Sequence, residues 1–178
     1  TVETAAIAKD YAHYLIASEE LEPGYGWDYS FLADLSANPQ LGGAELGTII
    51  ADKFVAFYAD SGEDATLSGI DLSGVDDVLQ AMGNLMAACN EDFSEANFKE
   101  FAKSRKNTKV FGGGSPRDNA CDMVDICDMA AQLAPYYQDE AEAVIQAVEN
   151  AVVYLKSSEG VKGAAGLSTY YVFGGKEQ

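Results

Sequence analysis

The stretch TLSGIDLSGVDDVLQAMGNLMAAC, residues 66–89, decides the fold class. Its first part, Thr66 to Leu72, alternates enough to be a strand. Ser73 then begins a helix in a capping-box pattern, with Asp76 three residues on as its partner. The apolar residues that follow recur at spacings of three and four and form the buried side of that helix: Val75, Val78, Leu79, Met82, Leu85, Met86 and Cys89. A strand followed at once by an amphipathic helix predicts an α/β domain.

The same alternation extends in both directions along the chain. Helical patterns are predicted at 1–10, 29–37, 44–59, 93–109 and from Asp139 to about 150, and strands at 14–17, 152–155 and 167–173. Alternating strands and helices predict a sheet with helices on both faces. The length of 178 residues, 48% of them apolar, fits one domain over 1–178 with a substantial core.

The charge is strongly acidic, with 29 acidic against 11 basic residues and a net charge of −18. Such a surface repels nucleic acid and anionic membranes, so neither is expected as a partner. No apolar run is long enough to span a membrane. Two interpretations of the charge stay open: it serves solubility, or it attracts substrates that carry lysine or arginine.

The cysteines do not suggest a disulfide framework or a zinc site, because Cys89, Cys121 and Cys127 are sparse, odd in number and without a CxxC pair. Cys89 is expected in the core. The acidic neighbours of Cys121 and Cys127 should raise each thiol pKa and make a poor nucleophile. His13 is the one histidine. No signal peptide is visible, and the chain opens directly on a helical pattern, as a piece of a longer protein would.

Two groups of side chains are candidates for function. Glu19 and Glu20 follow the apolar run 14–17, where a strand can deliver residues to a binding crevice; the alternative is a charged turn. Tyr25 and Trp27 lie close by and could equally be core aromatics. The aspartates Asp122, Asp125 and Asp128 could gather around calcium, although their spacing is not that of an EF-hand; the alternative is a solvated, irregular stretch.

Three passages carry a resemblance to a known family. ASEELEPGYGWDY (residues 17–29), CDMVDICDMA (residues 121–130) and GLSTYYVF (residues 166–173) resemble, in this order, stretches of the clostripain family of cysteine peptidases, which is related to gingipains, legumains and caspases. The resemblance implies a caspase-like α/β sandwich and cleavage after arginine or lysine by a histidine–cysteine dyad.

In that family the catalytic cysteine immediately precedes a helix that corresponds to Thr1–Lys9. The resemblance therefore places the dyad upstream of Thr1, with no catalytic residue in this chain, which would be inactive alone and would need the N-terminal part of the same catalytic domain. It also implies a secreted or cell-surface location and a candidate dependence on calcium. The residues expected to border the pocket for the basic side chain are Ser18, Glu19, Glu20, Pro23, Gly24, Tyr25 and Trp27.

Two other functions compete with the peptidase. A caspase-like fold without activity could use its acidic face to bind a basic partner, and a small acidic protein could bind calcium. A further hypothesis concerns the basic segment 93–109: an enzyme that cuts after basic residues could process itself at Arg105 or Lys106 if that turn were exposed.

Overall fold

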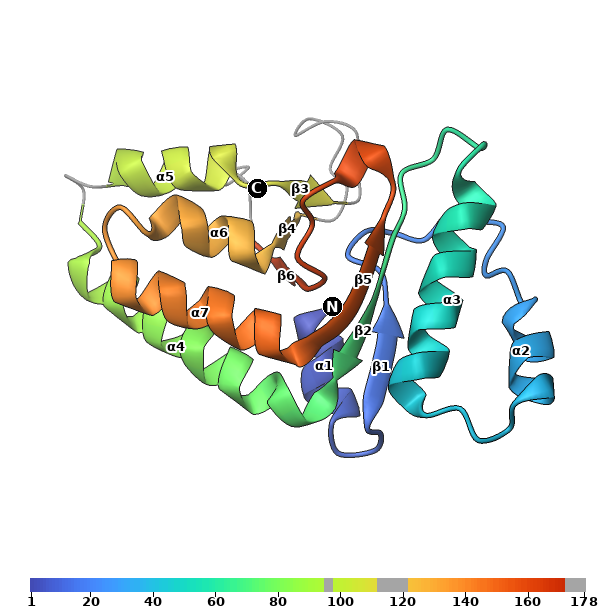
Figure 1. Ribbon diagram of the computed structural model, residues 1–178. Coiled ribbons are helices and arrows are strands. Elements are labelled where there is room, and N and C mark those ends of the chain that lie inside the picture. The colour runs from blue at the N-terminus through green and yellow to red at the C-terminus, as the bar shows by residue number, and fades with distance from the viewer. Residues whose placement is uncertain (95–97, 112–121, 172–178) are drawn as a thin grey trace.

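The computed structural model describes residues 1–94, 98–111 and 122–171 (Figure 1). Helices and strands alternate along these residues. The helices are α1 (Val2–Ala8), α2 (Phe31–Ala37), α3 (Gly43–Tyr58), α4 (Val75–Asp92), α5 (Phe98–Asn107), α6 (Ile126–Leu133) and α7 (Gln138–Ala151). The strands are β1 (Tyr14–Ala17), β2 (Thr66–Asp71), β3 (Val110–Phe111), β4 (Met123–Asp125), β5 (Val152–Ser157) and β6 (Ser168–Tyr170).

The strands form two antiparallel sheets of three strands each. In the first sheet β2 lies between β1 and β5, and in the second β4 lies between β3 and β6. The pairing of β2 with β5 shifts register between Gly69 and Ile70. β2 is the central strand of its sheet, and every residue from Thr66 to Ile70 is buried.

Two apolar cores flank the first sheet. Figure 1 shows α2 and α3 on one side of it and α1, α4 and α7 on the other. On the α3 side, Phe54 and Tyr58 pack against Leu67 of β2. Gly47 lets α3 approach β1 closely, because a Cβ there would lie 2.5 Å from the end of the Ile16 side chain. The second core is larger and joins α1, α4, α6 and α7.

The α/β architecture predicted from the sequence is confirmed, but one helix was missed. Residues 126–133 form α6, whereas the sequence pattern predicts a candidate metal site or a solvated segment there. Asp125 begins this helix as its N-cap, and its side chain accepts a hydrogen bond from Asp128 N. The helix then buries an apolar face made of Ile126, Met129, Ala130 and Leu133.

The hypothesis of self-processing at Arg105 does not fit the structure. Arg105 lies inside α5 and is 5% exposed. Its Nε donates to Tyr171 O at 2.6 Å, its Nη2 lies 3.4 Å from Asp122 Oδ1, and its guanidinium sits over the Tyr171 ring. Lys106 is exposed but helical. The segment is therefore a folded helix and not the exposed turn that cleavage would require.

No described helix is both long and apolar enough to cross a membrane.

Candidate functional site

The loop between β1 and α2, residues 18–30, contains all the pocket residues that the sequence predicted. We divide it into an inner half, residues 18–20, and an outer half, residues 21–30. The inner half is tied to β2 through Thr66, which is fully buried. Glu19 N donates to Thr66 Oγ1 at 3.0 Å, while the Glu20 carboxylate accepts from Thr66 N at 2.5 Å and from Thr66 Oγ1 at 2.7 Å. Ser18 Oγ donates to Glu20 O at 2.6 Å.

The carboxyl group of Glu19 points into the protein. Glu19 is 2% exposed, and its Oε1 accepts a hydrogen bond from Gly166 N at 2.6 Å. Its Oε2 is buried and receives no hydrogen bond from the N–H and O–H donors of the described residues. Gly166 has φ +97°, and a Cβ there would lie 2.8 Å from Val152 Cγ1. The donor to Glu19 is thus held by a turn that only glycine fits.

Asp125 is the second buried carboxyl group at this point, with 1% exposure. Its Oδ1 accepts from Asp128 N at 2.8 Å and its Oδ2 from Ala165 N at 2.7 Å. The consecutive amides of Ala165 and Gly166 therefore each bind one carboxyl group. Burial first, and then the charge of Asp125, raises the pKa of Glu19 to about 8. Burial also raises the pKa of Asp125.

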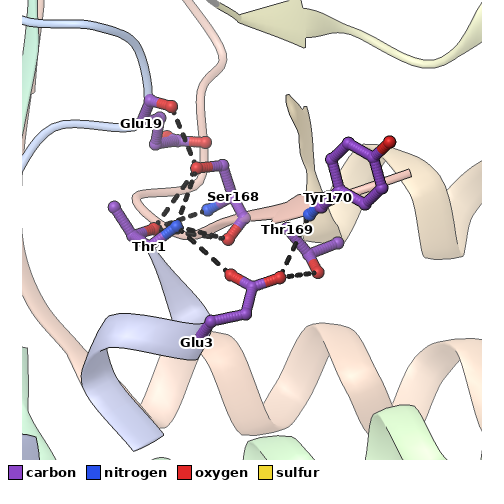
Figure 2. Close-up of polar contacts among 6 residues, drawn as sticks. All are labelled: Thr1, Glu3, Glu19, Ser168, Thr169 and Tyr170. Carbon is purple, nitrogen blue, oxygen red and sulfur yellow. Dashed lines mark hydrogen bonds and ion pairs between the residues drawn. The ribbon is translucent and has the colours of Figure 1, made fainter. Parts of the chain in front are cut away.

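Ser168 connects this cluster to the start of α1 (Figure 2). Ser168 Oγ donates to Glu19 O at 2.9 Å, and Ser168 N donates to Thr1 Oγ1 at 2.9 Å. Two residues farther along β6, Tyr170 N donates to Glu3 Oε1 at 3.1 Å. Thr1 and Glu3, at the start of α1, thus bind alternate amides along the edge of β6. The inner half of the loop contacts β6 at the same place, through Glu19 and Ser168.

The backbone of the outer half is bound by α3, and several of its side chains are exposed to solvent. Tyr58 is buried, and its hydroxyl donates to Gly26 O at 2.6 Å. Trp27 packs edge-on against Phe54 with ring centroids 6.3 Å apart, and its Nε1 donates to Glu22 Oε2 at 2.6 Å. Tyr25 is 87% exposed. This half therefore combines a fixed backbone with an exposed carboxylate and exposed aromatic groups.

The structure separates the predicted pocket residues into two sets. Ser18, Glu19 and Glu20 form internal hydrogen bonds, whereas Gly24, Tyr25 and Trp27 lie in the outer half together with Pro23. Substrate contact by any of them stays a prediction, but Glu19 has almost no surface to offer. Glu22 was not singled out from the sequence, although an indole N–H needs a nearby acceptor and Glu22 is the acid five residues away.

Comparison with known protein families shows where the chain belongs. The model of the clostripain family, Peptidase_C11, matches residues 1–173.

The chain belongs to the clostripain family of cysteine peptidases.

Solved structures of this family share the caspase-like α/β fold of the chain. The inactive zymogen of a C11 protease from Parabacteroides distasonis is 20% identical, with a TM-score of 0.69 over 94% of this chain and 48% of that one. A clostripain from Bacteroides thetaiotaomicron, in complex with the peptide inhibitor BTN-VLTK-AOMK, is 19% identical, with a TM-score of 0.70 over 94% of this chain and 72% of that one.

A secreted C11 cysteine protease from Bacteroides thetaiotaomicron is also similar, at 18% identity and a TM-score of 0.65, over 89% of this chain and 40% of that one. The chain thus spans about half the length, 48%, of the zymogen that it resembles. A search of the curated proteins returned no match.

Cys127 of this clostripain-family chain has the raised thiol pKa that the sequence predicted, with a different main cause. Burial, more than the neighbouring acids, raises the pKa of the Cys89 thiol to about 11 and that of Cys127 to about 12. Cys89 packs against the larger core, as expected. His13 contributes its carbonyl oxygen to Leu72 N. Cys121 lies outside the described residues.

The three aspartates expected to gather around calcium point to separate partners. Asp122 pairs with Arg105, Asp125 binds Ala165 N, and Asp128 accepts a hydrogen bond from Lys109 N. Within residues 1–94, 98–111 and 122–171, no three metal-ligating side chains come together. These three carboxylates thus do not converge on one point within the described residues, and dependence of the parent enzyme on calcium stays a prediction.

Proposed function

We propose that this chain, residues 1–178, is the C-terminal part of the catalytic domain of a cysteine endopeptidase that cleaves after lysine or arginine. The observation that carries the proposal is the outer half of the β1–α2 loop. In this half, Trp27 Nε1 donates a hydrogen bond to Oε2 of the exposed Glu22 carboxylate at 2.6 Å, and Tyr58 binds the backbone. We assign this half to the wall of the pocket that receives the basic side chain.

Electrostatics support this choice of substrate. The hydrogen bond from Trp27 orients the Glu22 carboxylate, and an oriented carboxylate makes charge-assisted bonds to an ammonium or guanidinium group. The net charge of −18 increases the local concentration of cationic substrates. The peptide part of the inhibitor bound to the similar clostripain reads VLTK and so ends in lysine.

The position of α1 supports a nucleophile outside the chain. The described thiols remain protonated at neutral pH, because their pKa values are raised to about 11 and about 12. The family pattern places the catalytic cysteine immediately before the helix that corresponds to α1, and Thr1 contacts Ser168 beside the inner half of the loop. The nucleophile would then lie next to the inner half of the loop, which leads into the proposed pocket wall. The chain alone would be inactive, and the enzyme secreted or at the cell surface.

The test compares peptides in the full-length parent protein. We expect cleavage of substrates with lysine or arginine before the cut, and little cleavage when norleucine or citrulline replaces them. Glu22→Gln should raise KM for basic substrates by about two- to five-fold with a smaller change in kcat, because one exposed charge contact is worth about 0.5–1 kcal/mol. Glu91→Gln, an exposed glutamate on α4, serves as the matched control and should change neither constant.

Equal cleavage of neutral and basic peptides would rule out the proposed specificity. If the parent cleaved no peptide but bound lysine-rich peptides with an affinity that fell as salt rose, the alternative of a non-catalytic binding module with an acidic face would replace the peptidase.

A further inference from the structure

The buried pair Glu19 and Asp125 has one oxygen too many for its hydrogen-bond donors. Both side chains are almost fully buried, and they contact each other. Three of their four oxygens accept backbone N–H groups, from Gly166, Ala165 and Asp128. The fourth, Glu19 Oε2, receives none. A buried carboxylate oxygen without a donor is costly, and two ionised carboxylates in contact inside a protein repel each other.

A single proton resolves both problems, and the contacts determine where it lies. Both Asp125 oxygens already accept amide hydrogens, which favours the ionised form of Asp125. Glu19 Oε1 accepts from Gly166 N, so only Oε2 is free to carry a proton. We propose that Glu19 is a neutral acid at neutral pH, that its Oε2–H donates to the Asp125 carboxylate, and that Glu19 thereby acts as a positioning residue for the start of α1.

The positioning acts through Ser168. The Glu19–Asp125 pair fixes the turn at Ala165 and Gly166 that leads into β6, and Ser168 binds both Glu19 O and Thr1 Oγ1. Loss of the proton would leave Glu19 and Asp125 both negatively charged, next to the hydrogen bonds that join Ser168 to Glu19 and Thr1. This role rests on the proposed function, under which the nucleophile precedes Thr1, but the state of the proton does not depend on it.

The charged surroundings favour the neutral form. The groups that face the pair within the described residues include Glu20 from the same loop, and Asp128 and the Cys127 thiol from α6. The charge of Glu149 in α7 also raises the pKa of Cys127, and the Lys109 ammonium is bound to Lys162 O. The acids that surround the pair thus add to burial, which raises the pKa of Glu19 from its ordinary 4.5 to about 8.

The sign of the pH dependence follows. Between pH 4.5 and about 8 the folded protein holds a proton that the unfolded chain releases. The free energy of unfolding should therefore fall as pH rises through this window and level off above it. An acid whose pKa is lowered on folding would give the opposite slope.

Glu19→Gln in the full-length parent is the decisive variant. Its amide oxygen can accept from Gly166 N and its NH2 group can donate to Asp125, so it reproduces the neutral acid permanently. We expect the fall in unfolding free energy between pH 4.5 and 8 to be smaller than in the wild type. The infrared carbonyl band of a protonated carboxyl group at pH 6.5 should disappear. Glu91→Gln should leave both unchanged.

Catalysis supplies a second readout. If the ionised form is inactive, the wild-type kcat/KM for a lysyl peptide should fall about ten-fold between pH 7 and 9, and Glu19→Gln should remove this part of the fall. Glu19→Ala should be impaired at every pH, and Glu19→Gln should restore activity at pH 7.

The two proposals fail separately. An inactive parent that still shows the band and the altered stability profile would overturn the peptidase proposal alone. An active parent with no protonated carboxyl band, or a Glu19→Gln profile identical to the wild type, would overturn the proton-sharing pair alone.

Discussion

The inner and outer halves of the β1–α2 loop use similar residues for different purposes. Each carries at least one glutamate, yet Glu19 is buried against Gly166 and Asp125, whereas Glu22 is exposed and accepts a hydrogen bond from the Trp27 indole. The inner half makes its hydrogen bonds to β2 and to the turn before β6, and the outer half is fixed through its backbone by Tyr58.

The difference teaches that charge in a loop is not in itself a sign of contact with substrate. A carboxyl group whose oxygens are occupied by backbone amides joins elements of the fold. One that is exposed and oriented by a single donor remains available to a ligand. Substitutions in the two halves should therefore change different quantities, and the following predictions test that division.

The largest effect is expected for Glu19→Ala. It removes the acceptor of Gly166 N, leaves Asp125 without its partner and opens a cavity, so the free energy of unfolding at pH 6 should fall by about 2–4 kcal/mol. Urea unfolding of the full-length parent measures this loss. A loss below about 0.5 kcal/mol would mean that the inner half does not hold the fold together.

A smaller loss of stability is expected for Thr66→Val. Valine keeps the shape of the side chain but removes the hydroxyl that accepts from Glu19 N and donates to Glu20 Oε2. The loss should be about 1–3 kcal/mol, because a buried amide is left unpaired. Thr48→Val is a suitable control, since the Thr48 hydroxyl bonds only within its own helix, to Ala44 O. Equal losses in both variants would contradict the special role of Thr66.

The smallest effect is expected for Tyr25→Ala in the outer half. Tyr25 is 87% exposed, so unfolding free energy should change by less than about 0.5 kcal/mol. If the ring borders the substrate, KM for a lysyl peptide should rise, and Tyr11→Ala, with a ring 86% exposed after α1, should leave KM unchanged. A stability loss as large as that of Thr66→Val would remove the distinction between the two halves.

Much of the fold could be predicted because its signals are local. The strand at 14–17, the strand and helix within 66–92 and the long helix α3 all follow from apolar periodicity and turn residues. The helix α6 was missed because Asp122, Asp125 and Asp128, in and just before it, suggested a metal site, although Asp125 directly before an apolar run is also a typical N-cap.

The roles of the two neighbouring glutamates could not be predicted from the sequence. Glu19 is distinguished from Glu20 by Gly166, which lies 147 residues away along the chain, and by Asp125 at the end of β4. Local patterns contain no information on such partners. The loop itself was found, because its motif is continuous in sequence, and only the division of labour inside it required the structure.

The concealed Arg105 has a consequence for the lifetime of such an enzyme. Under the proposed specificity, the enzyme meets its own lysines and arginines at high concentration, and each accessible one could be cut by a second copy. To expose the bond after Arg105, α5 must unwind and release Tyr171 and Asp122 together. The rate of self-cleavage at this bond would then measure the free energy of local unfolding of α5.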